Sequence, residues 1–207
     1  MNVNSGGVVY IEGRQLTIET AMQINGDLQL ADGRIYACTP ITLSGTGVID
    51  ARTAIGLGEG EILNDTDNDV TIGGLTLTGE LDLNCHMILD GNVVGDGTDT
   101  INVGGQTSDA IRLDGQGKLI ADDDSEIIFW NVAFANSQSA LKRLWVKSGT
   151  LRFTTWCHSL NIDWPLVIDG GGLFIVEDNT EFIVPCTLSS GTIRVAAEAT
   201  MVVDPPE

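Results

Sequence analysis

Residues 173–203, LFIVEDNTEFIVPCTLSSGTIRVAAEATMVV, contain one pattern written twice. In each half, two apolar pairs flank a short polar or small bend, EDNT in the first half and AAEAT in the second. The matching residues lie nineteen positions apart: Gly172 and Gly191, Phe174 and Ile193, Val176 and Val195, Phe182 and Met201, and Val184 and Val203. A repeat of this length predicts that the chain winds into stacked turns, with one repeat in each turn.

Apolar residues elsewhere in the chain alternate with polar ones at a period of two. LTLTGELDLN at 75–84 and IRLDG at 111–115 both show this alternation, which is typical of half-buried strands and not of helices. Each predicted strand is about three to five residues long. Strands this short are stable only if successive turns share one core, which is the principle of a β-solenoid.

Glycine followed by apolar residues at the second and fourth places recurs along the whole chain. It begins at Gly7, Gly26, Gly47, Gly79, Gly117, Gly149, Gly172 and Gly191. The spacing is near nineteen at both ends and reaches 32 to 38 in the middle. We interpret the long intervals as turns that carry extra loops. Protruding loops are therefore predicted within 56–74 and 91–110, which are rich in Gly, Asp, Asn and Thr.

These patterns predict one all-β domain over residues 1–207, a right-handed parallel β-helix with inserted loops and at most one short helix. The helix is predicted within 134–149, where a cap, good helix formers and a final glycine follow one another. The alternative is a jelly-roll or Greek-key β-sandwich. A sandwich has no need of a constant repeat length, so the nineteen-residue repeat favours the solenoid.

Charge restricts the partners that the protein can bind. The chain has 29 acidic and 10 basic residues and a formal net charge of −19. Without a basic stripe it is a poor ligand for a phosphate backbone, and we expect no nucleic-acid partner. Neither a secretory signal peptide nor an apolar run long enough to span a bilayer is present in the sequence, so no membrane partner is predicted.

Three aspartates, Asp65, Asp67 and Asp69, have the spacing of the first three oxygen ligands of an EF-hand loop. The match ends there, because Val70 replaces the required glycine and Thr76 the bidentate acid. Two hypotheses remain open, a calcium site of another loop geometry and an ordinary acidic turn. No other cofactor is predicted.

ADDDSE at 121–126 is the second acidic segment. Its carboxylates, on Asp122, Asp123, Asp124 and Glu126, could form the pair that a glycosidase places across a sugar ring. The segment falls where the C-terminal repeat has its bend, however, so its position predicts a corner of the solenoid.

Cysteine and histidine provide no recognisable metal or redox motif. The four cysteines form no CxxC pair, and we expect buried thiols. Both histidines directly follow a cysteine, which on a strand directs the two side chains to opposite faces. The residues are Cys38, Cys85, Cys157, Cys186, His86 and His158.

All four tryptophans fall within 35 residues of one another. This cluster predicts either additional core or an exposed patch that binds a partner. The residues are Trp130, Trp145, Trp156 and Trp164.

In its repeats, and in its lack of a recognisable catalytic constellation, the chain resembles the parallel β-helix superfamily, especially the non-enzymatic β-solenoid proteins of bacteriophage virions. The resemblance implies a rigid module, often a homotrimer, that is assembled in the host cytoplasm and binds major capsid or tail proteins. We expect a capsid decoration or cement protein. The alternatives are a tail fibre, spike or adhesin module, and a polysaccharide lyase or hydrolase of the β-helix type.

Overall fold

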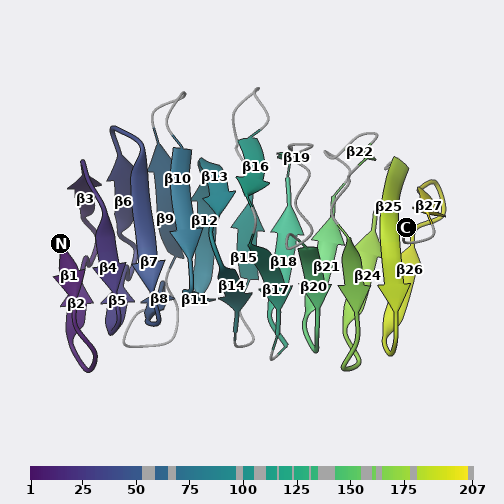
Figure 1. The fold of residues 1–207 in the computed structure, drawn as a ribbon, viewed down its shortest axis with the longest axis horizontal. Coiled ribbons are helices and arrows are strands. Elements are labelled where there is room, and N and C mark those ends of the chain that lie inside the picture. The colour runs from purple at the N-terminus through teal and green to yellow at the C-terminus, as the bar shows by residue number, and fades with distance from the viewer. Residues whose placement is uncertain are drawn as a thin grey trace.

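A computed structural model describes residues 1–52, 59–64, 69–96, 100–104, 111–115, 117–122, 124–130, 132–134, 143–154, 160–161, 165–177 and 181–204. These residues form a parallel β-solenoid whose turns follow one another along the long axis of the molecule (Figure 1). No helix occurs among them. Every strand pair in the described residues is parallel, which excludes the antiparallel jelly-roll or Greek-key alternative.

Three sheets form the walls of the solenoid, and a turn contributes one strand to each. The first sheet consists of β1 (Asn2–Val3), β4 (Met22–Ile24), β7 (Ile41–Gly45), β10 (Asp69–Gly73), β13 (His86–Leu89), β16 (Ile111–Gly115) and β19 (Val132–Phe134). The third sheet consists of β3 (Gln15–Ile18), β6 (Arg34–Ala37), β9 (Glu59–Asn64), β12 (Glu80–Asn84), β15 (Thr100–Val103), β18 (Glu126–Phe129), β21 (Thr150–Phe153), β24 (Leu173–Val176) and β26 (Thr192–Val195).

The second sheet lies between these two in chain order. It consists of β2 (Val8–Tyr10), β5 (Asp27–Gln29), β8 (Val48–Asp50), β11 (Thr76–Thr78), β14 (Asn92–Gly95), β17 (Lys118–Ala121), β20 (Arg143–Val146), β23 (Leu166–Ile168) and β25 (Glu181–Leu188). β25 is long enough to serve two walls. Its second half pairs with β23, and its first half pairs with β22 (Leu160–Asn161) and β27 (Thr200–Asp204), which take the place of the first sheet in the last turns.

The nineteen-residue repeat is one turn of the solenoid, as predicted. Phe174 is the direct ladder partner of Ile193, and Phe182 is the partner of Met201. The two apolar pairs of each repeat therefore belong to two different walls, and the polar bend between them is the corner that joins the walls.

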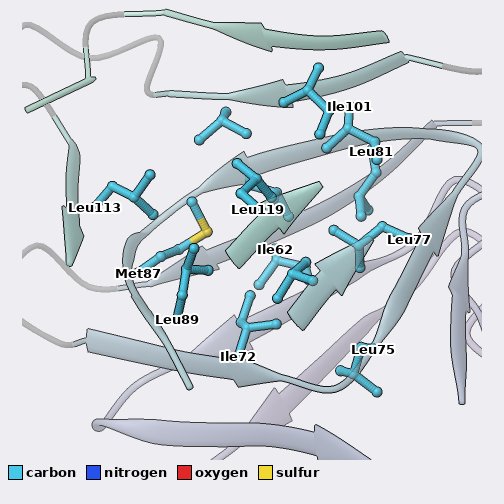
Figure 2. Packing of buried hydrophobic residues seen from close by; sticks show 14 of the residues in the cluster. Ile62, Ile72, Leu75, Leu77, Leu81, Met87, Leu89, Ile101, Leu113 and Leu119 are labelled. Atoms are coloured by element: carbon cyan, nitrogen blue, oxygen red, sulfur yellow. The ribbon is translucent and has the colours of Figure 1, made fainter. Parts of the chain in front are cut away.

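Along each strand, every second side chain points into the solenoid and the residues between point outward. Leu81 and Leu83 on β12 are buried, whereas Asp82 between them lies on the outer surface. Figure 2 shows Leu81 in the interior beside Ile101 of the next turn, with Leu77 of the second sheet and, farther across the same cluster, Ile72 of the first sheet. The core is thus a continuous column of side chains from three walls, which is why strands of three to five residues are stable.

The glycine pattern does not mark one corner throughout the chain, which corrects our interpretation of its spacing. Gly47 precedes β8 of the second sheet and Gly117 precedes β17 of the same sheet, but Gly79 precedes β12 of the third sheet. The intervals of 32 to 38 residues therefore run from one wall to another over more than one turn. They are not single turns with large loops.

Two further predictions are wrong in part. Within the predicted helix, Arg143–Val146 is strand β20, because Leu144 and Val146 fill interior positions beside Leu119 and Ala121. The remaining part, 135–142, lies outside the described residues. The predicted loops at 56–74 and 91–110 contain strands β9, β10, β14 and β15, and their other residues at 56–58, 65–68, 97–99 and 105–110 are not described.

Glycine is needed where successive corners touch. A Cβ on Gly26 would lie 2.2 Å from the carbonyl oxygen of Gly7, and one on Gly47 would lie 2.1 Å from that of Gly26. Both distances are far below van der Waals contact. The glycines therefore let backbone corners stack at the close separation of neighbouring strands.

Candidate functional site

The outer surface of the third sheet carries a chain of ion pairs that crosses three successive turns. Arg152 on β21 donates from Nε to Oε1 of Glu126 at 2.7 Å and from Nη1 to Oε1 of Glu177 at 2.9 Å. Glu126 belongs to the preceding turn and Glu177 follows β24 of the next turn. Partial burial by itself lowers the pKa of Arg152, but the hydrogen bonds to Glu177 and Glu126 raise it above its ordinary value.

The ADDDSE segment forms a corner between the second and third sheets, as its position predicts. Asp124 has a φ of 64°, and the Oγ of buried Ser125 donates to the carbonyl oxygen of Gly95 in the preceding turn at 3.0 Å. Asp122 accepts from Lys147 Nζ at 2.5 Å and from Ser148 Oγ at 2.9 Å. Asp123 lies outside the described residues. The carboxylates of Asp122 and Glu126 thus bind basic residues of the next turn.

Trp145 lies on the outer surface of the second sheet, among three charged residues. Its Nε1 donates to Oδ1 of Asp169 at 3.1 Å. Lys118 Nζ lies 5.4 Å from the centroid of the indole ring and Lys147 Nζ lies 6.0 Å from it, which is within cation–π range. The hydrogen bond to Asp122 and the negative charges of Asp122 and Asp169 raise the pKa of Lys147. This Trp145 cluster, composed of Trp145, Lys118, Lys147 and Asp169, combines an aromatic ring with cations on a strongly acidic protein.

The other tryptophans contribute less to the described surface. Trp130 follows β18 and is 39% exposed. Trp156 and Trp164 lie outside the described residues. The aromatic part of the interior is instead made of phenylalanines, namely Phe129, Phe153, Phe174 and Phe182. Of the two interpretations of the tryptophan cluster, the outward one fits Trp130 and Trp145, and their binding of a partner stays a prediction.

The calcium hypothesis stays a prediction. Asp65 and Asp67 lie outside the described residues. Asp69 begins β10, where its backbone pairs with that of His86. Within the described ranges, no three His, Cys, Asp or Glu side chains come together as a metal site would require.

The prediction of buried thiols is confirmed for one of the three described cysteines, Cys85. Cys85 is buried, and its burial raises the pKa of the thiol. The adjacent His86 is half-buried on the outer side, so the two side chains point in opposite directions. Cys38 and Cys186 are only half-buried, and burial also raises the pKa of Cys186. Cys157 and His158 lie outside the described residues.

The C-terminal end of the solenoid has a feature that sequence reasoning did not identify. Its last inward-facing side chains have no further turn over them among the described residues. Val195 is 41% exposed and Val203 is 50% exposed, although their ladder partners Val176 and Val184 are fully buried.

Comparison of the chain with protein-family models, with curated proteins and with solved structures finds no match. No part of the chain that the structure describes forms a helix capable of crossing a bilayer. Function is therefore inferred from the arrangement of the residues themselves.

Proposed function

We propose that this chain is a non-enzymatic virion structural protein, a capsid decoration or cement protein that docks on an assembled particle. The observation that carries the proposal is the ion-pair chain through Arg152, which joins three turns by charged side chains. Such a connection resists separation of the turns and is suited to a rigid module.

The same contacts favour a structural role over the polysaccharide-active alternative. A glycosidase must present two carboxyl groups to one sugar ring. Here Asp122 is held by Lys147 and Ser148, and Glu126 is held by Arg152. Both carboxylates are used in contacts between turns, so the acidic segment that resembles a catalytic pair has a structural explanation.

We assign docking to the Trp145 cluster on the second sheet; exposed Trp130 lies at the corner between the third and first sheets and is not part of that surface. Tryptophan is enriched where proteins bind one another, and it contributes a large share of the binding energy. A capsid surface with acidic groups matches the lysines of this cluster, whereas the remaining acidic surface keeps the undocked protein in solution. The partner is a major capsid protein, with a tail protein as the alternative.

Co-sedimentation with particles tests this proposal. The tagged chain is expressed in a host during phage infection, and particles are purified through a gradient. We expect the chain in the particle fraction, and at least tenfold less of it for Trp145→Ser. The matched control is Val167→Thr, beside Trp145 in the ladder. Absence of the wild-type chain from all particles would contradict the proposal.

A second assay tests the enzymatic alternative. The purified chain is incubated with a panel of acidic polysaccharides, and new reducing ends or unsaturated products are measured. We expect no release above the buffer control. Release that disappears in a Glu126→Gln variant would show that the protein is an enzyme.

A further inference from the structure

Basic residues are concentrated in one band of an otherwise acidic chain. Residues 112–152 contain six of the ten basic residues but only five of the 29 acidic ones. The band therefore has a formal charge of +1, from six bases and five acids, whereas the remainder of the chain has −20, from four bases and 24 acids. An acidic partner is repelled least strongly at this band.

Three cations of the band are half-buried among the described residues, namely Lys118, Lys147 and Arg152. Two of them are held by carboxylates of the chain itself. Lys147 binds Asp122, and Arg152 binds two glutamates of the neighbouring turns. Partial burial of a charge costs free energy because hydration is lost, and an opposite charge offsets that cost. The chain provides this compensation for two of the three cations.

Lys118 has no carboxylate partner among the described residues. Its ladder partners are Asn92 in the preceding turn and Arg143 in the next, so neither neighbour in its row is acidic. Its Nζ lies instead over the ring of Trp145, 5.4 Å from the centroid. A cation–π contact orients an ammonium group but does not neutralise it, and lysine has three N–H donors for further acceptors. Lys118 thus presents an oriented positive charge to a binding partner.

The surroundings of Lys118 are arranged before any partner binds. The Nε1 atom of Trp145 donates to Oδ1 of Asp169 at 3.1 Å, and Lys147 Nζ lies 6.0 Å from the ring centroid. Ile120, the ladder partner of Trp145 on the outer side, is only 5% exposed, so the cluster rests on an apolar floor. An ion pair beside such a floor is partly shielded from water and is stronger than one on an open surface. Preorganisation of this kind reduces the cost of binding.

We propose that Lys118 binds a carboxylate side chain, of aspartate or glutamate, on the particle protein to which this chain docks. The inference rests on the proposed docking function and assigns separate roles within the Trp145 cluster. Lys118 makes the ion pair with the partner. Trp145 and Asp169 position it, and Lys147 remains bound to Asp122 within the chain.

A protein carboxylate fits this site better than other anions. A phosphate group carries nearly two negative charges at pH 7 and is repelled more strongly by the acidic remainder of the chain. A sugar acid would stack on the indole, but the ammonium groups of both lysines already lie over that ring. An aspartate or glutamate side chain adds a single charge and requires only the ammonium group of Lys118.

Particle binding of matched variants tests the role of Lys118. In the co-sedimentation assay, Lys118→Ala should leave about tenfold less chain on particles, whereas Lys118→Arg should keep most of the binding because the charge is retained. Arg34→Ala is the control, since it removes the same charge from an exposed site on the third sheet, and it should bind like the wild type. All three variants change the outer surface and should keep the wild-type circular dichroism spectrum.

Two failures of this assay have different meanings. Wild-type binding by Lys118→Ala would overturn the assignment of Lys118 and leave the docking proposal standing. Absence of the wild-type chain from particles would overturn both.

Salt dependence separates an ion pair with the partner from a structural effect. Binding of the wild type should weaken as salt is raised from about 0.1 M to about 1 M, because screening weakens the pair. Lys118→Ala lacks the pair, so its residual binding should fall less steeply over the same range. An equally steep fall in both proteins would contradict the proposal.

Carbodiimide cross-linking identifies the group that Lys118 binds. The reagent activates a carboxylate, and the amine of an adjacent lysine then forms an amide bond with it. On docked particles, mass spectrometry should find Lys118 joined to an aspartate or glutamate of a particle protein, and Lys118→Arg should dock without this product. The Lys147–Asp122 pair within the chain is the positive control. A docked sample with the control product but none from Lys118, or with Lys118 joined to a sugar acid, would overturn the proposal.

Exchange of the two charges completes the test. Lys118→Glu should abolish docking, because two carboxylates then face each other. Replacement of the cross-linked acidic residue of the particle protein by lysine should restore docking of Lys118→Glu and weaken docking of the wild type. Failure to restore it would show that the two groups do not form a pair.

Discussion

Phe153 and Phe182 pack with their ring centroids 4.5 Å apart, although they come from different walls of the solenoid. Phe153 also stacks on Phe129 of the preceding turn at 4.5 Å, with an interplanar angle of 14°. It is therefore the central ring of a buried aromatic column that joins walls as well as turns.

Phe153→Ala should lower the free energy of unfolding by about 3–5 kcal/mol, because it removes a fully buried ring and leaves a cavity between its neighbours. Urea titration followed by circular dichroism measures the change. Phe153→Leu, which refills most of the volume, should cost clearly less. Equal effects of the two substitutions would show that the column relaxes and that ring packing is not what stabilises it.

Gly26→Ala should destabilise the protein by roughly 1–3 kcal/mol, the range for an added carbon in a packed site. The new Cβ would meet the carbonyl oxygen of Gly7 at 2.2 Å. Gly7→Ala is the matched control, since its Cβ would come no closer than 3.0 Å to any atom outside the neighbouring residues. Thermal unfolding of both variants measures the difference, and a milder effect at Gly26 than at Gly7 would contradict the close-packed corner.

Arg152→Gln should cost about 1 kcal/mol of stability, the upper part of the range for partly exposed ion pairs. The loss should shrink in 1 M salt, because screening weakens the wild-type pairs. Arg152→Lys should recover only part of it, since one ammonium group cannot reach Glu126 and Glu177 with separate planar donors. Arg34→Gln, at an exposed arginine of the same sheet, is the control; an equal loss there would show that the effect is not specific to the network.

Cys85 should resist alkylation in the native protein, because the thiolate is the reactive form and burial raises the pKa of this thiol. Cys186 should be alkylated more slowly than a free thiol. Because burial raises its pKa, its alkylation rate should keep rising at pH values above the ordinary pKa of a cysteine thiol. In the unfolded chain the Cys85 thiol ionises near its ordinary pKa of about 8.5, whereas burial keeps it protonated to higher pH in the folded protein. The stability that the protonated thiol contributes is therefore present below the unfolded pKa and is lost as the pH rises above it. Mass spectrometry after iodoacetamide treatment at pH 7 to 10 measures the reactivities. Modification of Cys85 at native pH would contradict its burial.

The sequence alone determined the architecture, because a parallel solenoid repeats its side-chain pattern once in each turn. The spacing between Phe174 and Ile193 therefore predicted a ladder pair that the structure contains. Period-two alternation at Leu81 and Leu83 likewise predicted which side chains face inward. Both signals are local, so they can be read without knowledge of the fold.

Tertiary structure alone decided which wall each repeat belongs to and which distant charges meet. Gly79 and Gly117 begin similar motifs on different walls, because a corner on any wall favours a small residue. Residues 143–146, predicted as part of a helix, form strand β20 because they join the ladder with β17 and the shared core, which outweigh the helix propensity of Arg143 and Leu144. Arg152 meets Glu126 and Glu177 only because the intervening turns have particular lengths, and those lengths vary along the chain. Local pattern thus predicts the turns, whereas contacts between them depend on how many residues each turn contains.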